Sequence, residues 1–123
     1  MKQDLGITED IDDKTGVTIV KLRQDISMDT SPVLRRYLMH LLKKKGLHVV
    51  VDLQSIKKID TSGLATLVEF AAQLRQKGGD IAVCGIHEEA TDTLSLKQVE
   101  NVLKMCRDCG EAMKKIETAD PQT

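Results

Sequence analysis

The sequence predicts a single α/β domain, in which a mixed β-sheet with a parallel centre is flanked by α-helices. Two short apolar runs, His48–Leu53 and Asp80–Ile86, have the β-branched composition of strands that are buried on both faces. Between them, apolar side chains recur at the spacing of one helix face: Leu64, Leu67, Val68, Ala71 and Leu74. Strand, helix and strand in this order form a parallel unit with a right-handed crossover.

An N-terminal hairpin is expected to extend this unit. Leu5, Ile7 and Ile11 alternate with polar neighbours, as in an edge strand. The segment Asp12–Gly16 has turn composition, and Val17–Leu22 returns as a second strand.

The first helix is expected to follow the polar loop Gln24–Asp29. Ser31 is predicted as its N-cap, because Pro32 then occupies the first helical position. The helix has one apolar stripe, made of Leu34, Tyr37, Leu38, Leu41 and Leu42. Lys43–Lys45 are expected in the last turn, where cations suit the helix dipole, and Gly46 is expected to end the helix.

The C-terminal third is expected to add two helices and a strand. A short helix is predicted within His87–Gln98, with Ala90 and Leu94 facing inward, and Asn101–Cys106 is predicted as the last strand.

Asp108 and Glu111 have the spacing of a capping box, which predicts a terminal helix that runs through Ile116. We therefore expect one domain over residues 1–117 and a polar tail over 118–123.

Composition excludes several classes of partner. The 123 residues include 18 basic and 19 acidic side chains, so the net charge of −1 gives no global attraction to nucleic acid or to an anionic membrane. One Tyr and one Phe do not make a stacking platform for single strands. No apolar run approaches the roughly 18 residues of a membrane span, and Met1–Asp4 opens a polar segment without a signal-peptide core. Three cysteines are an odd set, which favours reduced thiols and a cytoplasmic location.

The chain turns from sheet to helix at Asp60-Thr61-Ser62-Gly63. This order puts Ser62 at the expected N-cap, where its hydroxyl can bond an unpaired backbone N–H. The same N–H groups and the positive end of the helix dipole also favour a phosphate group there. From the residues alone, Ser62 is therefore either a simple cap or a phosphorylation site.

The stretch Val49–Leu67 reads VVVDLQSIKKIDTSGLATL and resembles the signature of the STAS domain, named for sulphate transporters and anti-sigma factor antagonists. In that family a strand ending in Asp-Leu leads to an Asp-Ser/Thr-Ser-Gly-Leu segment that opens a helix. The resemblance implies a STAS-type fold. It also implies that Ser62 is the phosphoacceptor, within a motif that includes Asp60, Thr61 and Gly63.

The resemblance further implies an anti-sigma factor antagonist that is not an enzyme and needs no cofactor. Its unphosphorylated form would bind an anti-sigma factor with serine kinase activity and so release the sigma factor. Phosphorylation would end this binding, and a metal-dependent serine phosphatase would restore it. The binding face would combine the loop before the first helix with the start of the second helix: Asp25, Ser27, Thr30, Asp60, Thr61, Ser62, Gly63 and Leu64.

The chain departs from the family pattern in that loop. Gln24 stands where the family often has Gly, and Ser27 stands where an acidic residue is common. Since this loop usually contributes to partner contact in the family, the departures leave the identity of the partner open. The alternative function is a STAS scaffold of a stress-sensing complex or an accessory subunit of a lipid transporter, which would use the same fold without the switch.

The residues also bear on two possible enzymatic functions. A serine hydrolase needs a base beside Ser62, and no motif ties any of the three histidines to it. Cys106 and Cys109 form a C-x-x-C at a strand-to-helix junction, which leaves a thiol oxidoreductase open. A zinc site would need a second ligand pair at the proper spacing, and Cys84 is expected in the core, so no metal site is predicted.

Overall fold

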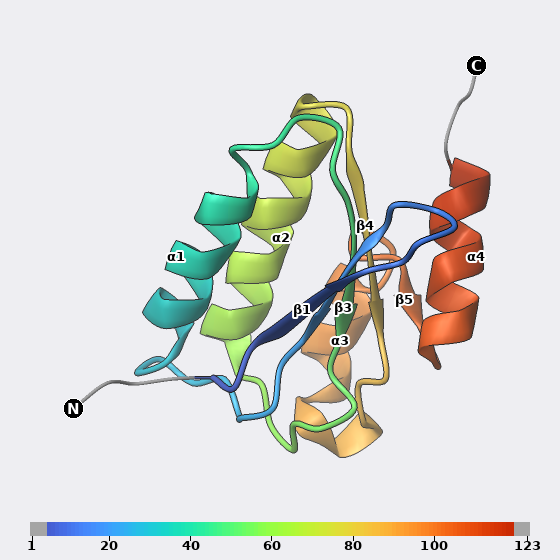
Figure 1. Ribbon diagram of the computed structural model, residues 1–123. Coiled ribbons are helices and arrows are strands. Elements are labelled where there is room, and N and C mark those ends of the chain that lie inside the picture. Colours follow the sequence, from blue (N-terminus) through green and yellow to red (C-terminus); the bar gives the residue numbers. More distant parts are fainter. Residues whose placement is uncertain (1–4, 120–123) are drawn as a thin grey trace.

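The computed structural model describes residues 5–119, whose strands form one five-stranded sheet in the order β1-β2-β3-β4-β5 (Figure 1). The N-terminal hairpin is antiparallel, with β1 (Thr8–Ile11) at the edge beside β2 (Thr18–Lys21). The remaining strands continue in parallel from β2 through β3 (His48–Asp52) and β4 (Asp80–Cys84) to the two-residue β5 (Met105–Cys106). The predicted mixed sheet with a parallel centre is confirmed.

Helices cover both faces of this sheet. Figure 1 shows α1 (Ser31–Leu41) and α2 (Thr61–Gln76) side by side on one face and α4 (Cys109–Ala119) on the other. Between β4 and β5 the chain forms a short 3₁₀ turn, η1 (Glu88–Ala90), and then α3 (Thr93–Val99). None of the helices in the described residues is long and apolar enough to cross a membrane.

Alternate side chains of the strands divide the core into two parts. Val49 and Val51 point toward α1 and α2, where Phe70 is the largest fully buried side chain. Val50 and Ala82 point the other way and pack beneath α4. The continuous apolar runs of β3 and β4 therefore serve two cores, as expected of a central parallel strand.

The predicted cap of the first helix is wrong by one residue. Ser31 is the first residue of α1, and Thr30 occupies the N-cap position without making a side-chain capping bond. Its hydroxyl instead accepts the N–H of Ser27 at 2.8 Å, so the loop before the helix uses this side chain for its own turn. Pro32 is therefore the second helical residue and not the first, although it still lies in the first turn.

The end of α1 is also earlier than expected. The helix ends at Leu41, and Lys43–Lys45 lie in the turns that follow it rather than in its last turn. Gly46 completes the turn with a positive φ of 66°, a conformation that glycine adopts without steric cost.

Two expectations fail in the segment before β5. Ala90 is buried as predicted, but Leu94 is 68% exposed, because α3 is too short to bury a complete apolar face. The strand predicted over Asn101–Cys106 consists of Met105 and Cys106 alone, and the residues from Asn101 to Lys104 form turns.

The terminal helix starts as predicted, and its return bond differs from a strict capping box in reaching the residue before the cap. Asp108 accepts the N–H of Glu111 at 2.9 Å, and the Glu111 carboxylate reaches back to the N–H of Arg107 at 2.8 Å. The helix continues to Ala119, two residues beyond the expected domain boundary, and the last four residues of the predicted tail lie outside the described residues.

Candidate functional site

The start of α2 is capped by Asp60 and not by Ser62, which corrects the predicted cap. Asp60 has an extended backbone, with φ −91° and ψ −179°, and its carboxylate accepts the N–H of Gly63 at 3.1 Å. Thr61 is the first helical residue, so Ser62 lies inside the first turn. Aspartate is as good a cap as serine, and its charge also suits the helix dipole.

Although Ser62 is not the cap, its side chain contacts the capping residue Asp60. Its hydroxyl donates a 2.6 Å hydrogen bond to the Asp60 carboxylate, and its carbonyl accepts the hydroxyl of Thr66 at 2.9 Å. Burial raises the pKa of Asp60, but bonds from the Ser62 hydroxyl and from neighbouring backbone N–H groups outweigh burial and lower that pKa below its usual value. The carboxylate therefore stays ionised at neutral pH and fixes the direction of the Ser62 hydroxyl.

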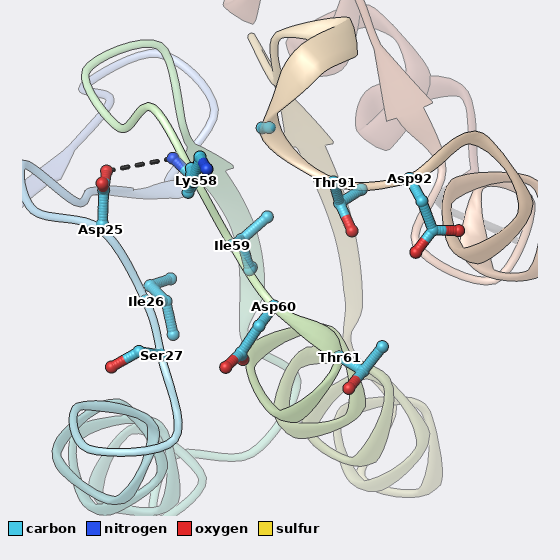
Figure 2. A pocket seen from close by; sticks show the side chains of 10 residues that line it. Asp25, Ile26, Ser27, Lys58, Ile59, Asp60, Thr61, Thr91 and Asp92 are labelled. Atoms are coloured by element: carbon cyan, nitrogen blue, oxygen red, sulfur yellow. Dashed lines mark hydrogen bonds between the residues drawn. The ribbon is translucent and has the colours of Figure 1, made fainter.

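The loop before α1 is tied to the segment that enters α2. Ile26 and Ile59 form a parallel β-bridge, in which Ile26 bonds Lys58 and Asp60 through its backbone at 3.0 Å each. Asp25 strengthens the tie, because its carboxylate accepts the N–H groups of Lys57 at 2.7 Å and Lys58 at 3.0 Å. Figure 2 shows the loop and this segment running side by side.

Gly63 allows the two segments to approach closely. A Cβ atom built on this residue would lie 2.7 Å from Cγ2 of Ile26 and 2.8 Å from Cγ1 of Ile59. Real side chains do not tolerate such distances. The glycine of the motif is thus required by packing inside this chain.

A third segment completes the site. The carbonyl of Ala90 accepts the N–H of Ile59 at 2.9 Å, which brings Thr91 and Asp92 beside the start of α2. The three segments surround an open hollow of about 490 Å³. Figure 2 shows Asp60 between Ser27 and Thr61, with Thr91 and Asp92 on the segment above Thr61 in this view.

The structure brings together the residues predicted for binding, but not all of them are at the surface. Thr61 and Asp25 are exposed, Ser27, Thr30, Asp60 and Ser62 are half-buried, and Gly63 is buried. Leu64 is 3% exposed and packs in the core, so its side chain does not reach the surface.

Met28, Thr91 and Asp92 also belong to this region, although they lie outside the sequence motif that predicts it. Met28 is 76% exposed in the loop before α1, and its backbone N–H contributes to the lowered pKa of Asp60. An apolar residue within a polar loop was the available signal for Met28. For Thr91 and Asp92, only the tertiary fold brings the segment after η1 next to α2.

A second cluster of polar side chains, with atoms that can coordinate a metal ion, lies outside this region. Among the described residues, a carboxylate oxygen of Asp52 and the sulfurs of Cys84 and Cys109 lie within 4.8 Å of one another. These residues are on the α4 face of the sheet, away from the start of α2.

The model of the STAS domain matches residues 10–112, which is most of the sequence. The chain belongs to the STAS domain family. The matching region contains both the start of α2 and the loop before α1, so the predicted family and fold are confirmed.

The relatives of this STAS domain include anti-sigma factor antagonists. It is 30% identical over 73 residues to the anti-sigma F factor antagonist of Paenibacillus polymyxa, a match that covers 58% of this chain and 62% of that protein. The match therefore spans less than two thirds of the relative's length.

Two solved structures share the fold at low sequence identity. A candidate anti-sigma factor antagonist from Thermotoga maritima has a TM-score of 0.77 and 19% identity, with 91% of this chain and 95% of that chain covered. The anti-sigma factor antagonist SpoIIAA, in its unphosphorylated form, has a TM-score of 0.71 and 9% identity, with 91% and 96% covered.

Proposed function

We propose that this STAS domain is a cytoplasmic anti-sigma factor antagonist whose binding is controlled by phosphorylation of Ser62. The unphosphorylated form binds an anti-sigma factor that is also a serine kinase, and the sigma factor is released. The kinase then phosphorylates Ser62 and ends the interaction. A metal-dependent serine phosphatase restores the first state, so ATP and metal ions belong to the partners.

The observation that carries the proposal is the position of Ser62. Its hydroxyl is half-buried at the N-terminal end of α2 and is oriented by Asp60 at 2.6 Å. A helix N-terminus offers unpaired N–H groups and a positive dipole, so a phosphate group there is compatible with the fold. A relative that is named an anti-sigma F factor antagonist supports the same function.

Charge explains how one phosphate group could stop binding. A phosphate adds about −1.5 to −2 charges at neutral pH, next to the carboxylate of Asp60. When a partner covers this surface, both charges lose water without gaining a counter-charge. A loss of about 3–4 kcal/mol, plausible for a buried unpaired charge, lowers affinity by roughly 100- to 1,000-fold.

The proposed binding face follows from exposure around the hollow. Thr61 and Met28 offer exposed contact area on two adjoining segments, and Thr91 and Asp92 form the third side. Met28 provides apolar surface, and methionine is among the residues that are enriched at the core of protein interfaces. Asp25 and Thr30 contribute by holding the loop in place.

Phosphate mapping tests the acceptor. The protein is incubated with its cognate anti-sigma kinase and ATP, and the product is analysed by mass spectrometry after proteolysis. We expect one phosphate group on Ser62, none in Ser62→Ala, and an unchanged yield in the matched control Thr61→Ala. Phosphate on Thr61, or full labelling of Ser62→Ala, contradicts the proposal.

Affinity capture from the native organism tests the partner. We expect the unphosphorylated protein to retain an anti-sigma factor with a kinase domain. If it instead retains sister STAS subunits or a transporter, and Ser62→Asp changes nothing, the domain is a scaffold or an accessory subunit.

A further inference from the structure

Only one cysteine of the C-x-x-C motif, Cys109, belongs to a group of side chains that the fold brings together around a carboxylate. Cys109 lies with Cys84, which is 25 residues earlier in the chain, and with Asp52. The ligand atoms of these three residues lie within 4.8 Å of one another. Cys106 is outside this group, and its thiol donates to the carbonyl of Lys104 at 3.3 Å.

Sheet register explains the convergence. Asp52 and Cys84 are paired neighbours at the ends of β3 and β4, so their side chains leave the sheet on the same face. That face is covered by α4, which begins at Cys109. The geometry is thus fixed by three regular elements rather than by a loop.

Backbone bonds hold the two strand ends in place. Leu53 donates to the carbonyl of Cys84 at 2.8 Å, and Gln54 donates to the carboxylate of Asp52 at 2.9 Å. A Cβ at Gly85, whose φ is +80°, would lie 2.3 Å from Cγ of Gln54, so the chain after Cys84 is packed tightly against this turn. A ligand set held in this way is largely preorganised.

We propose that Asp52, Cys84 and Cys109 form a binding site for a single thiophilic divalent cation, of which zinc is the leading example. Two thiolates and one carboxylate are suitable ligands for zinc, with a water molecule as the fourth. Tetrahedral ligands at about 2.3 Å from an ion are about 3.8 Å apart. The three ligand atoms lie within 4.8 Å of one another, so each pair would approach by about 1 Å at most.

Binding exchanges two protons for the ion. Each S–H group loses its proton to solvent, and the two thiolates and the Asp52 carboxylate then bind the cation, leaving a net charge of −1. Burial raises the pKa of both thiols, and the nearby Asp52 and Asp108 carboxylates raise that of Cys109 further, so both are protonated before the ion arrives. Entry is possible at Cys109, which is half-buried, whereas Cys84 is fully buried.

The ion would join β3 and β4 to α4. It would therefore act as a structural link on the sheet face opposite α1 and α2. This inference is independent of the proposed function, because Ser62 and the start of α2 take no part in it.

Cobalt titration of the reduced, full-length protein tests the site. We expect one equivalent of Co²⁺ to produce a thiolate-to-metal charge-transfer band, and Zn²⁺ to displace it. Cys109→Ser and Cys84→Ala should each weaken binding more than about 100-fold, since losing a ligand exceeds the loss of a supporting contact. Asp52→Asn should weaken it less. The matched control Cys106→Ala removes a neighbouring thiol and should leave affinity unchanged.

An NMR titration of the unmodified protein with Zn²⁺ keeps the test independent of variant folding. We expect the largest amide shifts at Asp52, Cys84 and Cys109. The proposal is overturned if no stoichiometric band forms, if Cys106→Ala abolishes the band while Cys84→Ala keeps it, or if the shifts gather at His48 or His87 instead.

Discussion

The hydroxyl of Ser62 donates to the carboxylate of Asp60, the residue that caps the helix in which Ser62 lies. The cap and the proposed phosphorylation site are therefore two neighbouring residues joined by a 2.6 Å hydrogen bond. Any change at the Ser62 oxygen acts directly on the Asp60 carboxylate.

Removing the Ser62 hydroxyl should raise the pKa of Asp60. In the native protein burial opposes ionisation, but hydrogen bonds from Ser62 and Gly63 lower the pKa below 3.8. A lowered pKa stabilises the fold above the unfolded-state value, and this contribution is lost as pH falls through the folded-state pKa. In Ser62→Ala one of these bonds is absent, so the contribution should shrink. Carboxyl-detected NMR titration measures the pKa directly.

The pH dependence of the unfolding free energy of Ser62→Ala gives a second test of the same hydrogen bond. The difference in unfolding free energy between native protein and Ser62→Ala should be largest near neutral pH and should narrow below about pH 4. Ser95→Ala is the matched comparison, because the Ser95 hydroxyl donates the equivalent bond to Asp92, the cap of α3, and its stability loss should narrow over the same pH range. An unchanged Asp60 pKa in Ser62→Ala would show that the hydroxyl contributes nothing.

Ser62→Asp should fold but should lose some stability. The substitution removes a charge-assisted hydrogen bond and puts a second carboxylate beside Asp60, while the helix dipole offsets part of the repulsion. We expect a loss of about 1–2 kcal/mol by urea denaturation. Ser62→Ala isolates the lost hydrogen bond, so the difference between the two variants measures the charge. A largely unfolded Ser62→Asp would mean that phosphorylation acts by disrupting the domain.

Gly63→Ala should destabilise the fold, even though alanine favours helices. Its Cβ would contact Ile26 and Ile59 at less than 3 Å, so the loop before α1 must move away from α2. Overpacking of this kind costs about 1–3 kcal/mol. Gly110→Ala is the matched control in α4, because its Cβ meets only a carboxylate oxygen of Asp108 at 3.2 Å. Equal stabilities of the two variants would argue against the close approach.

Asp25→Ala should loosen the loop without altering Ser62. It removes the acceptor for the N–H groups of Lys57 and Lys58, so both amides should exchange with solvent faster. Asp25→Asn should behave almost like the native protein, because its carbonyl oxygen can still accept. Asp29→Ala removes the same charge from the same loop and should leave these two amides unchanged. If exchange increases equally in Asp29→Ala, charge and not tethering explains the effect.

The sequence contained enough to predict the sheet, α2 and the position of the site. The apolar runs of β3 and β4 are continuous because both strands are covered on both faces, and this pattern needs no tertiary information. Asp60 and Ser62 were identified together. The sequence predicts Ser62 as the cap, whereas the structure has Asp60 in that role. Both residue types are good caps, and the sequence does not determine which of them has the extended backbone.

Features that depend on contacts between distant segments could not be predicted. Leu94 has the composition of a core residue and is exposed, since α3 is only a short helix at the end of the sheet. The short spacing of Cys106 and Cys109 predicts that these two cysteines form a pair. In the fold, the position of α4 over the end of β4 instead brings Cys109 to Cys84. Thr91 reaches the site only through the bond between Ile59 and Ala90.

The decisive measurement for the proposed switch is the affinity of the phosphorylated and unphosphorylated proteins for the anti-sigma factor. Titration calorimetry should show that one phosphate on Ser62 weakens binding by roughly 100-fold or more. The far-ultraviolet circular dichroism of the two forms should be the same. Charge reversal at Lys44 or Lys45, which follow the opposite end of α1, should change affinity by less than about fivefold. Equal affinity of the two forms, or binding controlled by Lys44 and Lys45, would contradict the account.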